Sequence, residues 1–279
     1  MTRTLCLALM LAIGLAAFAQ TAAPAPATIA PSTGPAPTDT PTVGQAEKKI
    51  LDDLQAAGDK FPTLTAKVLY TTSNPAEESV EIRTGDLSYQ KDTDKEPMKL
   101  LISFDKVTRA DVGPGGELLN KKTFPERVLY ALDGQWFTVM KFRINQMTRY
   151  QVAAAGEKVE PLRVGQGPFP LPFGQKAAEV IKFFEVKTRA PAADDPKNTV
   201  YLELTPRAAN AKSVGFTKLQ MWIDRDTNLP VKLVSTEKDG TVKSGEFSEI
   251  KTGEKFDQKI FSPEKPAGWD LTVEPLKKQ

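Results

Sequence analysis

Alternation of apolar and polar residues is the feature that most constrains this chain. From Thr63 onward, apolar side chains recur at every second position in one short segment after another, first at Leu64, Ala66, Val68 and Tyr70. This period is typical of β-strands with one buried face, because successive side chains of a strand point to opposite sides of a sheet. The sequence therefore predicts a fold made mostly of strands.

Turn signals indicate how these strands pair. Asp133-Gly134 and Asp239-Gly240 each separate two alternating segments, and Asp-Gly supplies the positive φ angles that a two-residue hairpin turn needs. Gly85 interrupts another segment, which is typical of a bulge or a sharp bend in a sheet. With mostly short connections, we expect about ten strands in an antiparallel meander.

Two short helices are expected, over residues 46–58 and 174–185, where apolar side chains follow a helical period. Two such helices cannot cover the inner face of about ten strands. The predicted fold is mostly β (α+β), an incomplete, highly curved antiparallel β-barrel whose concave face is covered by the two helices. Such a sheet encloses an apolar cavity, and the mouths of β-barrels are frequent ligand sites.

The N-terminal region has the pattern of an exported protein. Residues 1–19 combine Arg3, a short apolar run and the small residues of Ala17-Phe18-Ala19, as a signal peptide does. Residues 20–45 are rich in Pro, Ala and Thr, which favours a disordered, extended tether. We therefore expect one domain, 46–279, in a periplasmic protein.

Composition excludes several kinds of chemistry. The chain has no His and one Cys, Cys6, so catalytic imidazoles, disulfides and His or Cys metal sites are not expected. Its net charge of +2 does not indicate a basic surface that would bind nucleic acid. No GxxxxGK[ST] loop is present to hold a nucleotide. No cofactor or metal is therefore predicted.

Several short motifs in a fixed order resemble a known family. They are Gly85-Asp86-Leu87-Ser88-Tyr89, Asp133-Gly134-Gln135-Trp136-Phe137, Ile223-Asp224-Arg225-Asp226, Ile260-Phe261-Ser262-Pro263 and Pro266-Ala267-Gly268-Trp269-Asp270. With the helix before them, they resemble the LolA-type carriers of outer-membrane lipoproteins and, more loosely, the LolB-like proteins. The resemblance implies an open barrel with a helical lid and a cavity for acyl chains.

The chain departs from that family at the lid. The family usually carries an Arg-Pro pair after the Gly-x-Leu strand, and its Arg holds the lid shut, whereas Lys91-Asp92 stands at that place here. Lys91 or Lys99 are the candidates for a replacement, although most exposed lysines are only solvated charges. The connection over 105–126 also looks longer than in the family, and it is a candidate partner surface.

Candidate ligand-contacting residues are apolar. Phe169, Leu171 and Phe173 alternate with prolines that stiffen the segment, and Ile181 and Phe184 follow on the expected helix. Phe169, Phe173, Ile181 and Phe184 would form a gate over the cavity, or equally could anchor a loop and a helix to the core.

Further candidates lie in the expected strands. Trp136, Met140 and Met221 could line the cavity, since Met adapts to variable shapes, although an ordinary core role explains the methionines as well. The carboxylate pairs Asp194/Asp195 and Asp224/Asp226 could serve acid-base catalysis, but their turn-rich surroundings favour backbone capping.

Three classes of function follow. The first is a non-enzymatic carrier that binds acyl chains of lipoproteins or lipids and passes them to an acceptor protein of the envelope, working as a monomer. The second is an envelope sensor that uses the same fold to read lipids or lipoproteins and to regulate a partner. The third, an enzyme acting on lipids or glycans, is disfavoured by the lack of His and of a Gly-x-Ser-x-Gly motif.

Overall fold

The computed structural model describes residues 43–93, 96–154 and 176–276. Every described residue belongs to one compact unit, Pro41–Gln279. The predicted signal peptide and nearly all of the predicted tether lie outside the described residues. The domain boundaries inferred from the sequence therefore stay predictions.

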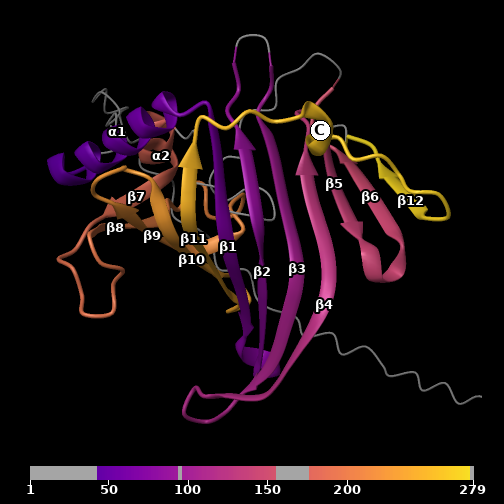
Figure 1. Ribbon diagram of the computed structural model, residues 1–279. Coiled ribbons are helices and arrows are strands. Elements are labelled where there is room, and N and C mark those ends of the chain that lie inside the picture. The colour runs from indigo at the N-terminus through magenta and orange to yellow at the C-terminus, as the bar shows by residue number, and fades with distance from the viewer. Residues whose placement is uncertain (1–42, 94–95, 155–175, 277–279) are drawn as a thin grey trace, which may run out of the picture. The chain divides into compact units, whose positions relative to one another are not determined.

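The described residues form one large sheet with two α-helices and three short 3-10 helices (Figure 1). The elements, in chain order, are α1 (Gln45–Lys60), β1 (Thr63–Asn74), η1 (Pro75–Glu77), β2 (Ser79–Gln90), β3 (Lys99–Val112), β4 (Leu118–Leu132), β5 (Trp136–Lys141), η2 (Phe142–Ile144), β6 (Gln146–Gln151), α2 (Ala177–Phe183), β7 (Phe184–Lys187), β8 (Thr199–Pro206), β9 (Phe216–Asp224), β10 (Pro230–Glu237), β11 (Val242–Thr252), η3 (Gln258–Phe261) and β12 (Asp270–Glu274).

The strand order is β12-β6-β5-β4-β3-β2-β1-β11-β10-β9-β8-β7. All neighbours are antiparallel except β12, which pairs in parallel with β6. The predicted fold class, an open and curled sheet of mostly antiparallel strands with two helices, is confirmed. The sheet has twelve strands in the described part of the chain rather than about ten.

Glycines occupy the turns and the bend that the sequence predicts. Gly134 (φ +99°) and Gly240 (φ +87°) complete the hairpins β4–β5 and β10–β11. At Gly85 the register between β2 and β3 shifts, and a Cβ atom there would lie 2.0 Å from the carbonyl oxygen of Ser103. The bulge at Gly85 is therefore confirmed, because only a residue without a side chain allows this close approach.

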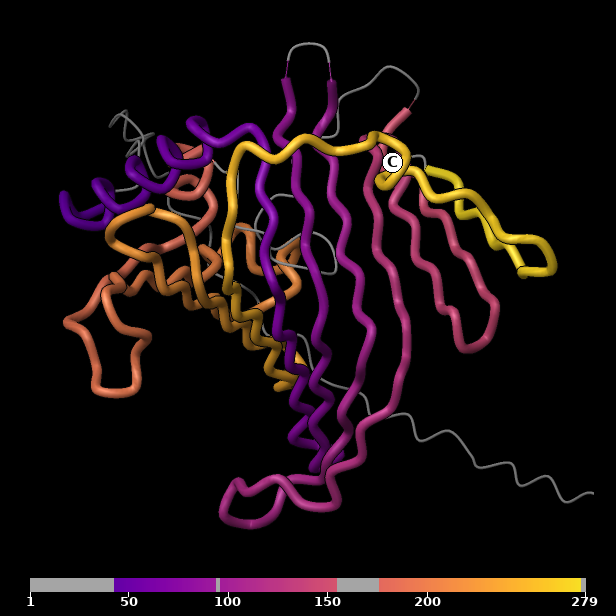
Figure 2. Tube along the Cα trace, in the orientation of Figure 1, coloured from indigo at the N-terminus to yellow at the C-terminus, as the bar shows by residue number. Residues whose placement is uncertain are grey.

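The segment 105–126 is a hairpin arm rather than the long loop that the sequence suggested. Strand β3 continues to Val112 and β4 begins at Leu118, so that a short turn joins two long strands (Figure 2). The strand signal is weak here because the register shifts between Phe104 and Lys106, where Asp105 and Lys106 are both exposed. Such a bulge interrupts the apolar–polar period.

The sheet has two arms, which run from β12 to β1 and from β11 to β7 in the strand order. It curls so strongly that strands from both arms share one core. Phe137 on β5 and Leu202 on β8 belong to the same cluster of buried side chains, although seven strands separate β5 from β8 in the sheet. Leu51 and Leu54 of α1 and Val180 of α2 complete this cluster. Both helices therefore cover the inner face of the sheet, as predicted.

Helix α2 is shorter than the sequence predicts. It ends at Phe183, and the chain continues from Phe184 as strand β7, which pairs with β8. Phe184 therefore belongs to a strand, and its placement on the helix was wrong. The β-period is hard to recognise because β7 has only four residues, too few for a clear pattern.

Candidate functional site

The apolar inner face of the sheet is the first candidate site. Rings of Tyr70, Phe104, Tyr130 and Phe137 follow one another across β1, β3, β4 and β5, with centroid distances of 6.0, 6.2 and 6.2 Å. Burial raises the pKa of the Tyr70 and Tyr130 hydroxyls above their ordinary values, because the charged phenolate is poorly solvated there. This face therefore disfavours charge and favours hydrocarbon.

A small apolar cavity lies within this face. Its volume is about 30 Å³, and its lining residues come from β1, β2, β3, β10 and β11: Val68, Tyr70, Leu87, Ile102, Phe104, Leu233, Lys243, Ser244, Gly245 and Phe247. A volume of this size holds about one water molecule, whereas pockets for small molecules have roughly 300–1,000 Å³. A hydrocarbon chain fits only if side chains or helices that cover the face move aside.

Helix α1 packs on the sheet by one apolar stripe and contacts α2 and the residue after β7. It buries Leu51, Leu54 and Ala57 against the inner face, and its stripe arises because positions three and four apart lie on one side of a helix. The Ala177 N–H of α2 donates to Gln55 Oε1 (2.8 Å), and the Thr188 N–H donates to Glu47 Oε1 (3.3 Å). Helix α1 thus covers the inner face through one apolar stripe and makes polar contacts with its neighbours.

Lys91 is one of the polar contacts between α1 and the sheet. Its ammonium group forms an ion pair with Asp59 near the end of α1, and its backbone N–H donates to the Pro62 carbonyl (2.8 Å). Lys99 lies elsewhere. Its Nζ contacts Gln258 Oε1 (2.5 Å) and Glu96 Oε2 (3.5 Å). Of the two lysines, Lys91 is therefore the one placed to hold the helix.

Other predicted residues fall on both sides of the sheet. Met221 is buried in the main cluster, and Ile181 is half-buried against it. The ring of Phe184 stacks on Phe216 (5.8 Å) and is only 3% exposed, which is the environment of a core residue. Phe169, Leu171 and Phe173 lie outside the described residues, so the gate that they would complete stays a prediction.

Trp136 and Met140 do not join the inner face. Phe137 points inward, so Trp136 and Met140, at odd offsets from it on β5, point to the other side. Met140 belongs instead to a second cluster with Leu129, Ala131 and Met147. The prediction that Trp136 and Met140 line the cavity placed them on the wrong side of the sheet. The sequence alone does not show this, because β5 carries apolar residues on both sides.

The candidate carboxylates stabilise loops. Asp195 accepts hydrogen bonds from both terminal nitrogens of Arg189 (2.7 and 2.8 Å) and from Trp222 Nε1 (2.6 Å). The Arg189 guanidinium and the Ala192 N–H hold the pKa of Asp195 well below its ordinary value. Asp224 Oδ1 accepts from the backbone N–H of Thr227 (2.9 Å), as a turn-capping side chain does.

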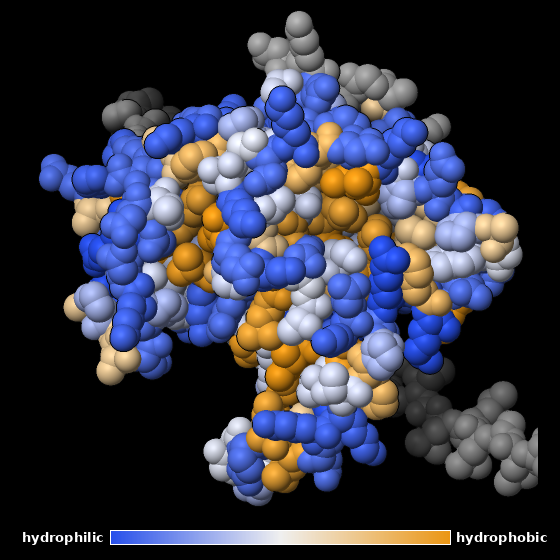
Figure 3. All heavy atoms as spheres, viewed as in Figure 1, coloured by the Kyte–Doolittle hydropathy of each residue, from blue (hydrophilic) through white to orange (hydrophobic). Residues whose placement is uncertain are grey.

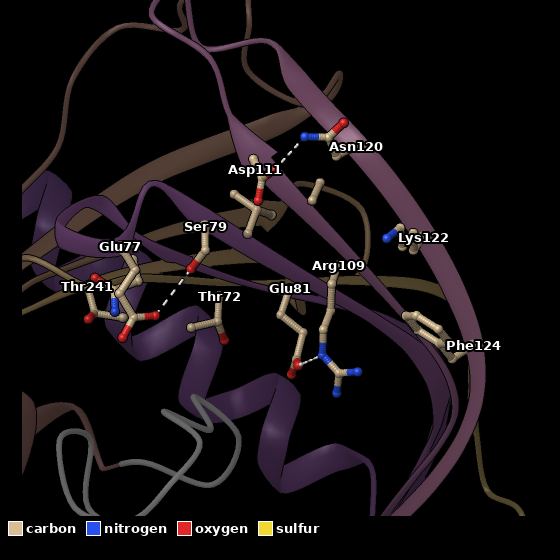
Figure 4. A pocket seen from close by; sticks show the side chains of 13 residues that line it. Thr72, Glu77, Ser79, Glu81, Arg109, Asp111, Asn120, Lys122, Phe124 and Thr241 are labelled. Atoms are coloured by element: carbon tan, nitrogen blue, oxygen red, sulfur yellow. Dashed lines mark hydrogen bonds and ion pairs between the residues drawn. The ribbon is translucent and has the colours of Figure 1, made fainter.

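A larger, polar cavity lies where the long strands β1–β4 end (Figure 4). It has a volume of about 710 Å³, and its lining residues are Thr72, Asn74, Glu77, Ser79, Val80, Glu81, Arg109, Ala110, Asp111, Asn120, Lys122, Phe124 and Thr241. Glu81 points toward Arg109, and Asn120 donates to Asp111 (2.7 Å). Sequence reasoning missed this site, although charged residues at alternate positions of β2 and β3 were a usable signal.

Two arginines and two glutamates form a closed ring beside this cavity, which we call the Arg–Glu ring. Arg83 donates to Glu81 (2.7 Å) and to Glu126 (3.2 Å), and Arg109 donates to the same two carboxylates (3.1 and 3.0 Å). Burial acts to raise the pKa of Glu126, but the hydrogen bonds from Arg109 and Arg83 outweigh it, and the net shift is downward. Glu126 is therefore ionised at neutral pH.

Among the described residues, no group of three or more His, Cys, Asp and Glu side chains is arranged to bind a metal ion. None of the helices described here is long and apolar enough to cross a membrane. Hydrophobic side chains nevertheless show on the face of Figure 3 over the central strands, between hydrophilic side chains at the periphery.

Comparison with known proteins gives structural neighbours. No protein-family model and no curated protein matches the chain. Solved structures with a similar fold include an uncharacterized conserved protein from Thermus thermophilus (11% identity, 82% of this chain, 100% of that chain, TM-score 0.43). LprF from Mycobacterium bovis is 13% identical over 77% of this chain and 97% of its own, with a TM-score of 0.42.

A third neighbour is a LolA superfamily protein from Nitrosomonas europaea. It is 14% identical over 77% of this chain and 96% of its own, with a TM-score of 0.34. Its name is that of the family that the sequence motifs resemble.

Proposed function

We propose that this protein is a non-enzymatic periplasmic carrier that binds the acyl chains of lipids or lipoproteins against the inner face of its sheet and passes them to an acceptor protein. The observation that carries the proposal is the inner face itself. It is a continuous apolar surface built from both arms of the sheet, with a small cavity in it and a helix over it that few polar contacts hold.

The free energies of hydrophobic burial support displacement of helix α1 by a hydrocarbon chain. Burial of twelve methylene groups contributes about 9–10 kcal/mol before the costs of association, at about 0.8 kcal/mol for each group. Uncovering α1 exposes two leucines and an alanine, and each leucine costs about 1.5–3 kcal/mol to expose. An acyl chain can therefore replace the helix contacts and still bind.

Transfer would follow from differences in affinity. The sequence has no nucleotide-binding loop of the GxxxxGK[ST] type, so release of cargo would be driven by an acceptor that binds the same chain more tightly. Opening of α1 would expose both the cargo and the inner face. The acceptor would have to cover the same apolar surface.

Photo-crosslinking tests the site of binding. A fatty acid with a diazirine at the end of its chain should label residues around the small cavity, such as Val68, Ile102 and Phe247. Leu129 and Met147, buried on the other face, serve as the internal control and should stay unlabelled. Labelling of the outer cluster at equal yield would contradict the proposal.

Native mass spectrometry tests the cargo. Protein purified from its own envelope without detergent should carry acylated molecules whose masses differ from that of the bare chain by those of lipids or acylated peptides. Bare protein that also fails to bind fluorescent fatty-acid probes would refute the carrier function.

A further inference from the structure

The inner face of the sheet changes from apolar to charged along the long strands. Facing residues of β1, β2 and β3 form three successive rows: Val68, Gly85 and Phe104; Tyr70, Arg83 and Val107; and Thr72, Glu81 and Arg109. The first row borders the small apolar cavity and the third borders the large polar cavity. The middle row, with Arg83, is therefore the boundary between the two.

Arg83 has an unused donor at this boundary. Its Nε and Nη2 atoms bind Glu81 and Glu126, whereas Nη1 is buried and has no hydrogen-bond partner. The side chain as a whole is 14% exposed. A buried donor without a partner is costly, and such groups in folded proteins usually have an explanation, of which a role in binding a ligand is one.

The ring holds Arg83 and Arg109 in place by two carboxylates. Arg143 Nε lies 3.7 Å from Glu126 as well, and with Arg143 the group has three cations against two anions. Guanidinium groups fit carboxylate and phosphate oxygens with paired hydrogen bonds. The chemistry of the boundary therefore suits an anionic oxygen group next to hydrocarbon.

We propose that the Arg–Glu ring binds the anionic headgroup of an amphiphile whose hydrocarbon chain lies on the apolar inner face. The inference rests on the proposed carrier function and specifies its ligand as an acidic lipid. The headgroup would accept hydrogen bonds from Arg83 Nη1 and lie at the entrance of the polar cavity. The large polar cavity would then hold the rest of the headgroup, and the helix-covered part of the face would hold the chain.

Binding of matched probes tests this proposal. We would measure the affinities of the folded chain for dodecanoate and dodecanol at pH 8, below micelle-forming concentrations, by displacement of a fluorescent fatty acid. The two probes share one hydrocarbon chain, so the ratio of their dissociation constants isolates the headgroup. Dodecanoate should bind at least about tenfold more tightly, a difference of about 1.4 kcal/mol.

Substitutions show which side chains cause the preference for dodecanoate. Arg83→Gln should bring the ratio to about one while the affinity for dodecanol stays the same. If Arg83→Gln does not fold, Arg109→Gln gives the same readout, because that side chain is 47% exposed and its loss leaves less buried charge unpaired. Lys232→Gln, which removes a cation paired with Glu246 (3.0 Å) outside this site, is the control and should keep the tenfold ratio.

Three outcomes would overturn the proposal in distinct ways. Equal binding of both probes by the unchanged protein would exclude a headgroup site and leave the carrier function in place. Competition by acetate at the same concentration as dodecanoate would indicate a site for small free anions. Binding of neither probe would refute the carrier function itself.

Discussion

Lys91, directly after β2, forms an ion pair with Asp59 near the C-terminal end of α1. The pair lies where the family that the sequence resembles has its Arg-Pro, and it joins the covering helix to the sheet. Asp59 is more than half exposed, and pairs of this kind contribute about 0–1 kcal/mol. The ion pair can therefore influence opening of the helix without dominating the stability of the fold.

Lys91→Gln should accelerate exchange of a fluorescent fatty acid several-fold while the melting temperature changes little. The physical reason is that the substitution removes a weak ion pair from the closed state, which lowers the free-energy cost of opening. Stopped-flow displacement measures the rate. Lys48→Gln removes an ion pair with Asp52 inside α1 (2.6 Å) and is the matched control. Equal acceleration in both variants would show that helix stability alone sets the rate.

Phe184→Ala should behave as a core truncation. The ring is almost fully buried and stacks on Phe216, so its loss should reduce the free energy of unfolding by about 3–5 kcal/mol. Ile181→Ala, on the half-buried side of α2, should cost less and should accelerate probe exchange. Denaturant titration and exchange kinetics on both variants separate the roles. Faster exchange with an unchanged midpoint for Phe184→Ala would restore it as a gate residue.

Gly85→Ala should destabilise the sheet, because the new methyl group would meet the Ser103 carbonyl oxygen at 2.0 Å. Both atoms belong to paired strands and cannot move apart without breaking the register. Gly245→Ala on β11 is the matched control, since its Cβ would lie 3.6 Å from the Phe247 ring, an ordinary contact. Thermal unfolding should show a clear loss for the first variant and little change for the second.

Asp195 should contribute to stability at neutral pH and lose this contribution in acid. Its pKa in the folded chain is lower than the ordinary value of about 3.9, so the unfolded chain binds a proton first as the pH falls. The contribution is complete above about pH 5 and is lost progressively as the pH falls below about 4 towards the lowered pKa of the folded chain. The difference in melting temperature between the unchanged protein and Asp195→Asn should therefore shrink from pH 7 to pH 3. A difference that is constant with pH would contradict the ion pair with Arg189.

Local signals predicted most of this fold, because they act through the backbone. The turns at Gly134 and Gly240 depend on positive φ angles that few residues other than glycine adopt. The bulge at Gly85 depends on the close approach of the Ser103 carbonyl, which leaves no room for a side chain. The stripe of α1 depends on spacing alone. What local signals did not predict was which side of β5 faces inward, since both sides carry apolar residues and only the tertiary packing decides between Phe137 and Met140.

The polar half of the candidate site escaped prediction for a related reason. Alternation of charged residues on β2 and β3 looks like an exposed surface until the bulge at Gly85 and the length of the hairpin place it beside the apolar face. Arg83 on β2 and Glu126 on β4 then approach each other across β3, from positions far apart in the chain. Contacts of this kind depend on sheet order and register, which the sequence does not show.

Strand β1 pairs with β2, its neighbour in the chain, on one side and with β11 on the other, so that Leu64 lies opposite Thr252. The two arms of the sheet thus meet along a seam between segments from opposite ends of the described chain. Contacts between residues so distant in sequence form slowly, because a long loop must close before they gain any energy. We therefore expect refolding to take place on a timescale of milliseconds to seconds, with the β1–β11 seam formed last.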